Sequence, residues 1–209
     1  MKQNKFLSVS LLLSTLSLLT SFGPGVVIAG PAFPPPPPSM PPDEKISHTQ
    51  SGPDVDVWEI HKPNVKNPIT HYKSIIFKSG DQITIEAGGG VQTGGLSKTW
   101  KLYIDPRGAN SEKLYHGLIH IPQGPNANYP KSPTVKEMDM VRIQDVLRKG
   151  QKLKYQDKDD SFEPNHLVLG YEDDGYGDNG YWGHDDGIGD QTKGVGPAWL
   201  KITIEHKKQ

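Results

Sequence analysis

Hydrophobic and polar residues alternate in a series of short runs that begin near residue 55. Between Gln82 and Ala87, for example, every second residue is apolar, which is the pattern of a strand with one buried and one solvated face. The runs with β-strand character are Val55–Ile60, Tyr72–Phe77, Gln82–Ala87, Trp100–Ile104, Gly117–Ile121, Met138–Ile143, Leu167–Tyr171 and Trp199–His206. Turn-forming segments separate them, and only Val141–Gln151 is ambiguous between helix and strand. The pattern predicts an all-β fold, an antiparallel β-sandwich of the jelly-roll type.

The N-terminal residues have a different composition. Lys2 and Lys5 precede an apolar run from Phe6 to Phe22, and small residues ending at Ala29 follow a Gly-Pro break. This order predicts a secretory signal peptide over residues 1–29, and hence a protein that is secreted or held at the cell surface. A retained membrane anchor is the alternative, although serines and threonines interrupt the run.

A proline-rich segment follows the expected cleavage point. Its consecutive prolines cannot join a helix or a sheet and favour an extended spacer. We therefore expect a linker over residues 30–53 and a single folded domain over residues 54–209.

Charge and cysteine content narrow the classes of partner. The formal net charge is −1, and it becomes −3 when the two lysines of the leader are removed. A mildly acidic chain is a poor candidate for nucleic-acid binding. The chain has no cysteine, so an exported form needs a sizeable core, a metal ion or both for its stability.

The segment Tyr171–Asp190 is the most unusual part of the chain, with seven carboxylates and six glycines but no Lys or Arg. Carboxylates at this density repel one another unless they are solvated or bind a cation. Calcium takes about six to eight oxygen ligands from carboxylates, amides and backbone carbonyls. The residues that can present such oxygens here, through side chains or turning backbone, are Asp173, Asp174, Gly175, Gly177, Asp178 and Asn179.

Two other interpretations of this segment remain open. It can be a solvated acidic loop without a ligand, as charge runs usually are. It can also bind a transition metal through His184 and the adjacent Asp185 and Asp186, although one imidazole with two neighbouring acids is a weak pattern.

Several motifs resemble the PA-IL-type galactose-binding bacterial lectins. "SIIFKSGDQITIEAGG" is similar to a strand and turn near the start of that family, and "TGGLSKTWK" to its calcium-side loop. "HGLIHI", "HLVLGYEDDGYGDNG" and "LKITI" follow in the family's order. The resemblance covers Ser74 to Ile204, with insertions near residues 125–135 and 181–197.

The resemblance implies a calcium ion that bridges the protein and two hydroxyls of a terminal galactose. It assigns side-chain ligation to Asp173, Asp178 and Asn179, with backbone carbonyls from Thr93 and Gly175. The spacing after Asp173 is shorter than in the family, so Asp174 is an alternative ligand. With this alternative included, the calcium ligands that the resemblance implies are Thr93, Asp173, Asp174, Gly175, Asp178 and Asn179.

Four residues are candidates for contact with a sugar. His116 takes the place of a sugar-contacting amide of the family, and Tyr115 lies beside it. Tyr176 and Trp182 lie in the acidic segment, where aromatic rings are suitable platforms for sugar rings. Trp182 is equally suited to anchor its own loop.

We therefore expect an exported calcium-dependent carbohydrate-binding protein, possessing galactose-type specificity if the resemblance extends to the sugar, and able to form a homo-oligomer. The first alternative is a structural or adhesion domain in which calcium stiffens loops without binding sugar. The second is a glycoside-acting enzyme, which needs two separated carboxyl groups; the sequence offers no such pair and no hydrolase motif. We accordingly expect no enzymatic activity.

Overall fold

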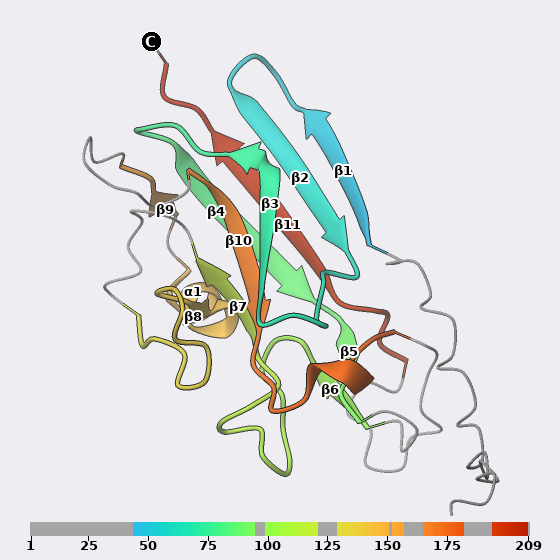
Figure 1. The fold of residues 1–209 in the computed structure, drawn as a ribbon. Coiled ribbons are helices and arrows are strands. Elements are labelled where there is room, and N and C mark those ends of the chain that lie inside the picture. Colours follow the sequence, from blue (N-terminus) through green and yellow to red (C-terminus); the bar gives the residue numbers. More distant parts are fainter. Residues whose placement is uncertain are drawn as a thin grey trace, which may run out of the picture. The chain divides into compact units, whose positions relative to one another are not determined.

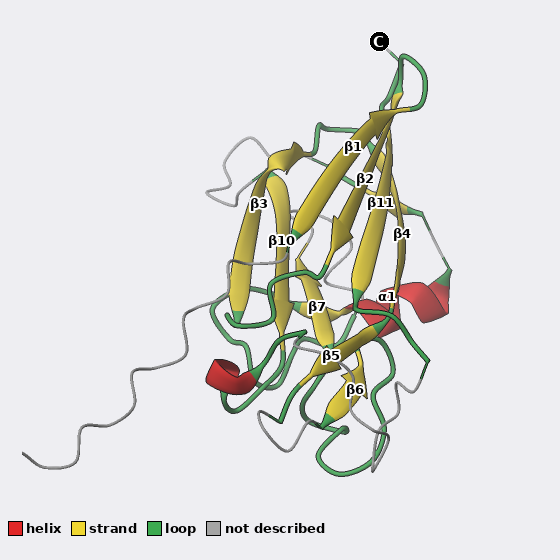
Figure 2. Cartoon of the chain, turned by 90° about the vertical axis from the view of Figure 1, so that its right-hand side faces the viewer, coloured by secondary structure: helices red, strands yellow, loops and turns green. Residues whose placement is uncertain are grey.

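The computed structural model describes residues 44–94, 99–120, 129–150, 152–156, 165–181 and 194–208. Antiparallel strand pairs form two main sheets that pack face to face, with one short α-helix among the described residues (Figures 1 and 2). The fold is thus all-β and sandwich-like, as the alternation predicts. No described helix is long and apolar enough to cross a membrane. The expected signal peptide over residues 1–29 lies outside the described residues.

The larger sheet has five strands, in the order β1 (Lys45–Gln50), β2 (Val55–His61), β11 (Trp199–Glu205), β4 (Gln82–Gly88) and β9 (Leu153–Lys154). The smaller sheet has four, in the order β3 (Ile69–Ile76), β10 (His166–Tyr171), β7 (Gly117–His120) and β8 (Val141–Arg142). A separate hairpin pairs β5 (Gly90–Gln92) with β6 (Trp100–Leu102). The helix is α1 (Ile143–Lys149), and a 3-10 turn, η3, spans Tyr176–Asp178.

The core lies between the two main sheets, where the period-two pattern places alternate side chains. In β11, Leu200, Ile202 and Ile204 are buried, and this strand pairs with β2 on one side and β4 on the other. In β4, Ile83 and Ile85 are buried. Burying such branched side chains is worth about 1.5–3 kcal/mol each, so the alternation accounts for the orientation of both strands.

Every run with predicted strand character contains a strand, but some elements differ from the prediction. The ambiguous stretch divides into β8 and α1, and the helix ends at Gly150, whose φ of 59° is left-handed. The structure also places β1 inside the predicted linker over residues 30–53. All six of its residues are exposed, so its sequence shows no clear alternation of apolar and polar residues. The segment is a strand because it pairs with β2.

His206 follows directly after β11, and its contacts with two carboxylates make the stability of the domain depend on pH. His206 lies between two carboxylates, with Nε2 2.9 Å from Asp56 Oδ2 and Nδ1 3.0 Å from Asp81 Oδ1. The contact with Asp56 raises the pKa of His206, burial lowers it, and Asp81 raises it further. The His206 contribution is therefore complete below the unfolded pKa of about 6.5 and is lost as the pH rises through the raised folded pKa.

We expect the free energy of unfolding to fall by roughly 1 kcal/mol between pH 6.5 and 8.5 through this group. Urea denaturation of the wild type and of His206→Gln at both pH values measures the effect. The variant should lose most of the pH dependence; an equal slope in both proteins would contradict the assignment.

Candidate functional site

The described part of the acidic segment, residues 171–181, and the end of β5 meet at one end of the sandwich, away from the C-terminus (Figure 1). Gln92 and Gly180 exchange both backbone hydrogen bonds, each with an N–O distance of 3.0 Å. This pairing is an antiparallel bridge, so Thr93, the residue after Gln92, lies beside Asn179. The structure therefore brings together two predicted ligand positions that are far apart in the sequence.

Asp173 lies at the start of the acidic segment, directly after the end of β10, and only 7% of its surface is exposed. Its Oδ1 accepts hydrogen bonds from the backbone amides of Asp174 at 2.7 Å and Gly175 at 3.3 Å. Its Oδ2 is buried and accepts none from the described residues. Burial raises the pKa of Asp173 to about 6, although the nearby Asn179 side chain lowers it.

Asn179 lies at the other end of the same loop and is completely buried. Its Nδ2 donates to the carbonyl of Val65 at 2.9 Å, which orients the amide. Its Oδ1 is buried and receives no hydrogen bond from the described residues. The side-chain amide of Asn179 is thus held in one orientation, in which its Oδ1 can act as an acceptor.

Asp173 Oδ2 and Asn179 Oδ1 are two buried oxygens that receive no hydrogen bond of normal geometry from the described residues. The Asn179 side chain nevertheless lies close to the Asp173 carboxylate and lowers its pKa as a hydrogen-bonding partner. Nearly all buried polar atoms in proteins have a partner, and leaving one unsatisfied costs about 1–3 kcal/mol. A hydrogen-bond donor or a cation would remove that cost. A carboxylate oxygen, an amide oxygen and nearby backbone carbonyls form the type of ligand set that calcium prefers.

The remaining predicted ligands lie on the outer side of the loop. Asp174, Gly175 and Asp178 are exposed, and Asp178 ends the 3-10 turn η3. No group of three or more His, Asp or Glu side chains in the described part of the chain is arranged to hold a metal. Any site here would therefore depend on amide and carbonyl oxygens besides carboxylates.

Tyr115 forms a wall beside the loop. Its backbone is left-handed, with a φ of 72°, and its amide donates to the carbonyl of Glu172 at 2.6 Å. Burial raises the pKa of its hydroxyl, Asn110 lowers it, and the carboxylates of Asp173, Asp174 and Asp178 raise it. The half-buried ring is thus within electrostatic reach of these carboxylates, and Lys101 Nζ lies over one of its faces, 5.3 Å from the ring centroid.

His116 and Tyr176 have their polar atoms engaged by the protein. His116 is 4% exposed, and its ring nitrogens lie 3.0 Å from Gln144 Oε1 and 2.7 Å from the carbonyl of Ser111. The hydroxyl of Tyr176 donates to the carbonyl of Tyr171 at 2.9 Å. In this arrangement neither side chain offers its polar atoms to a ligand. Trp182 and the His184–Asp186 cluster lie outside the described residues.

A buried ion pair holds the start of the loop, and sequence reasoning missed it. Glu172 is fully buried and lies 2.9 Å from Arg142 Nε and 2.8 Å from Arg142 Nη2. Ser132 Oγ donates to the same carboxylate at 2.6 Å. The amide of Glu172 also donates to the carbonyl of His116 at 3.0 Å. The one signal for this ion pair in the sequence was Arg142, the single arginine within the largely apolar run that contains β8.

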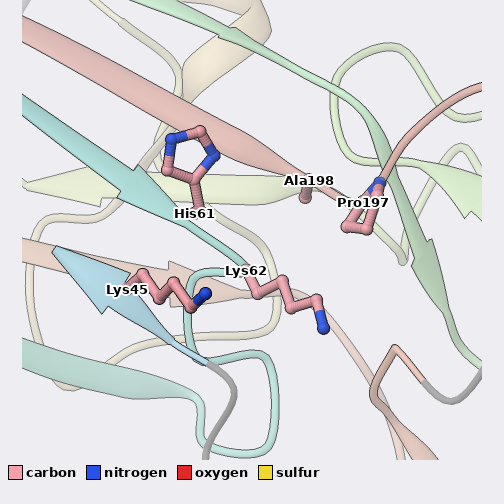
Figure 3. Close-up of a pocket in the computed structure, with 5 residues that line it drawn as sticks. All are labelled: Lys45, His61, Lys62, Pro197 and Ala198. Carbon is pink, nitrogen blue, oxygen red and sulfur yellow. The ribbon is translucent and has the colours of Figure 1, made fainter.

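A pocket of about 350 Å³ lies at a different place on the domain, where Lys45, His61, Lys62, Pro197 and Ala198 line it (Figure 3). Its side-chain polar atoms are nitrogens of basic residues. None of the predicted ligand or sugar-contacting residues lines it. Calcium prefers oxygen ligands, so this pocket does not compete with the acidic loop as a calcium site.

No protein-family model, curated protein or solved structure matches the chain.

Proposed function

We propose that the protein is an exported, calcium-dependent carbohydrate-binding protein whose cation site lies in the loop from Asp173 to Asn179. The observation that carries the proposal is the pair of buried oxygens without donors, Asp173 Oδ2 and Asn179 Oδ1, beside Thr93. Asp173, Asn179 and the carbonyl of Thr93 would hold the ion. The exposed Asp178, or Asp174, and the carbonyl of Gly175 would complete the protein ligands.

Bound calcium would supply an open coordination position for vicinal sugar hydroxyls. The rest of the site would come from the chain itself, with Tyr115 as the wall against which a sugar ring packs. His116 would act only indirectly, because Gln144 and Ser111 already engage its ring nitrogens. The proposal includes galactose-type glycans as the ligand class and assigns binding, without catalysis, to this loop.

The test is a glycan array probed with the fluorescently labelled full-length chain in calcium and again in a chelator. We expect binding to terminal galactosides only in calcium. Array binding that is equal in the chelator, or absent in both conditions, would contradict the proposal.

A specific observation favours a second candidate, a calcium-stiffened structural domain. Two of the expected sugar contacts, His116 and Tyr176, are engaged within the protein. This candidate requires calcium to raise the melting temperature while no glycan raises it further, because any ligand of the native state stabilises that state.

A further inference from the structure

The strand β1 is the open edge of the five-stranded sheet (Figures 1 and 2). It pairs with β2 without interruption from Lys45 to Gln50, and all six of its residues are exposed. No backbone hydrogen bond joins its outer side to another described residue. A bare edge of this kind is a template for pairing with another strand.

The other sheet edges are protected in ways that β1 is not. The strands β9 and β8 are only two residues long. The register of β3 with β10 shifts between His166 and Leu167, which interrupts a regular edge. In contrast, β1 has no proline, no register shift and one charged residue, Lys45. Among the described strands it is the edge best suited to pairing.

The inner face of β1 also leaves apolar surface open. Ile46 pairs with Ile60, which is completely buried, yet Ile46 is 44% exposed. The next residue on that face, His48, stacks on Trp58 with ring centroids 4.0 Å apart. The core therefore ends at β2, and Ile46 and the His48 ring extend beyond it.

We propose that β1 pairs antiparallel with β1 of a second copy of this chain, with the two-fold axis at Ser47. In an antiparallel two-fold pair, the inner face of one strand continues as the inner face of the other only when the symmetry axis lies between a residue and the same residue of the partner. An axis at Ser47 places Ile46 opposite the partner's His48, and Lys45 opposite the partner's Thr49. On the inner face Ile46 then packs against the partner's His48 ring, whose Nε2 contacts Asp56 Oδ1 of its own chain at 2.9 Å, and no like charges face each other.

A neighbouring register is less favourable. An axis at His48 would place that imidazole opposite the partner's His48 and Ile46 opposite the partner's Gln50. An axis at Ile46 would place Ile46 opposite the partner's Ile46, but it would pair only residues 45–47 of each strand. An axis at Ser47 pairs residues 45–49, and this self-complementarity favours a second copy over an unrelated extended peptide.

A single strand pair buries less than the roughly 1,200 Å² of stable interfaces, so the dimer should depend on concentration. It would join two domains and two candidate sites, which raises avidity for multivalent ligands. The pairing does not depend on calcium or on sugar binding, so its failure would leave the proposed function unaffected.

Cysteine cross-linking tests the register, because the chain has no cysteine of its own. Opposite residues of antiparallel strands have Cα atoms about 4.5–5.5 Å apart, within the range of a disulfide. We expect Ser47→Cys in the full-length chain to form a covalent dimer under mild oxidation at low protein concentration. Gln82→Cys, at an exposed position on β4, is the matched control and should cross-link at least tenfold more slowly.

Sedimentation velocity of the wild type and of Ile46→Lys gives a second measurement. The wild type should show a monomer–dimer equilibrium that the charged variant shifts to monomer. A wild type that remains monomeric at high concentration, or a Ser47→Cys dimer no faster to form than the control, would overturn the proposal. A dimer that Ile46→Lys leaves intact would also overturn it, because another surface would then be responsible.

Discussion

Asp173→Asn should abolish the stabilisation of this protein by calcium and should make the calcium-free protein slightly more stable than the wild type. The buried carboxylate has a pKa of about 6 because of its burial, so at neutral pH its charge is held at a cost to the folded state. An asparagine oxygen can still accept the hydrogen bonds of the Asp174 and Gly175 amides. The variant should therefore keep the loop and lose the charge that calcium needs.

Thermal unfolding in EDTA and in calcium measures both effects. At a calcium concentration of 100 times its Kd, the wild type should gain about 2.7 kcal/mol, and Asp173→Asn should gain almost none. Asp174→Asn is the control that separates the two neighbouring carboxylates, and as an exposed residue it should retain most of the gain. A calcium response that survives in Asp173→Asn and disappears in Asp174→Asn would assign the ligand to Asp174 instead.

Glu172→Gln should destabilise the domain by roughly 3–5 kcal/mol, the usual effect of removing one partner of a buried ion pair. The carboxylate of Glu172 is fully buried, and 17% of the Arg142 side chain is exposed. Without the charge of Glu172, the Arg142 guanidinium would remain largely buried and uncompensated. Guanidinium chloride denaturation measures the change in the free energy of unfolding.

The double variant Glu172→Gln with Arg142→Met removes the uncompensated charge and should recover part of the loss. Asp139→Asn is a matched control, because Asp139 pairs with Lys131 at 2.6 Å on the surface, with both side chains more than half exposed. Such exposed pairs contribute about 1 kcal/mol or less. An equal loss in Glu172→Gln and Asp139→Asn would contradict the role assigned to the buried pair.

The sequence was sufficient to predict the sheets because their strands bury alternate residues. The runs around Ile83 and Ile202 carry that alternation, and both are central strands of the larger sheet. The strand β1 was missed for the same reason, since none of its residues is buried. The short strands β5 and β9 depend on tertiary pairing and leave no periodic signal of their own.

The candidate site was predictable only in its composition. A density of carboxylates and glycines indicates a cation loop, but it does not show which oxygens lack donors. That property depends on the Val65 carbonyl, which orients Asn179, and on the Gln92–Gly180 bridge, which brings in Thr93. The burial of His116 was equally invisible, because it depends on contacts with Ser111 and Gln144.

The most direct test of the central claim is isothermal titration calorimetry of the chelated, calcium-free protein, first with calcium chloride and then with galactose. The account predicts saturable calcium binding, followed by galactose binding only to the calcium-loaded protein. Galactose binding to the calcium-free protein, or an absence of calcium binding, would contradict the claim that the loop from Asp173 to Asn179 is a calcium-dependent sugar site.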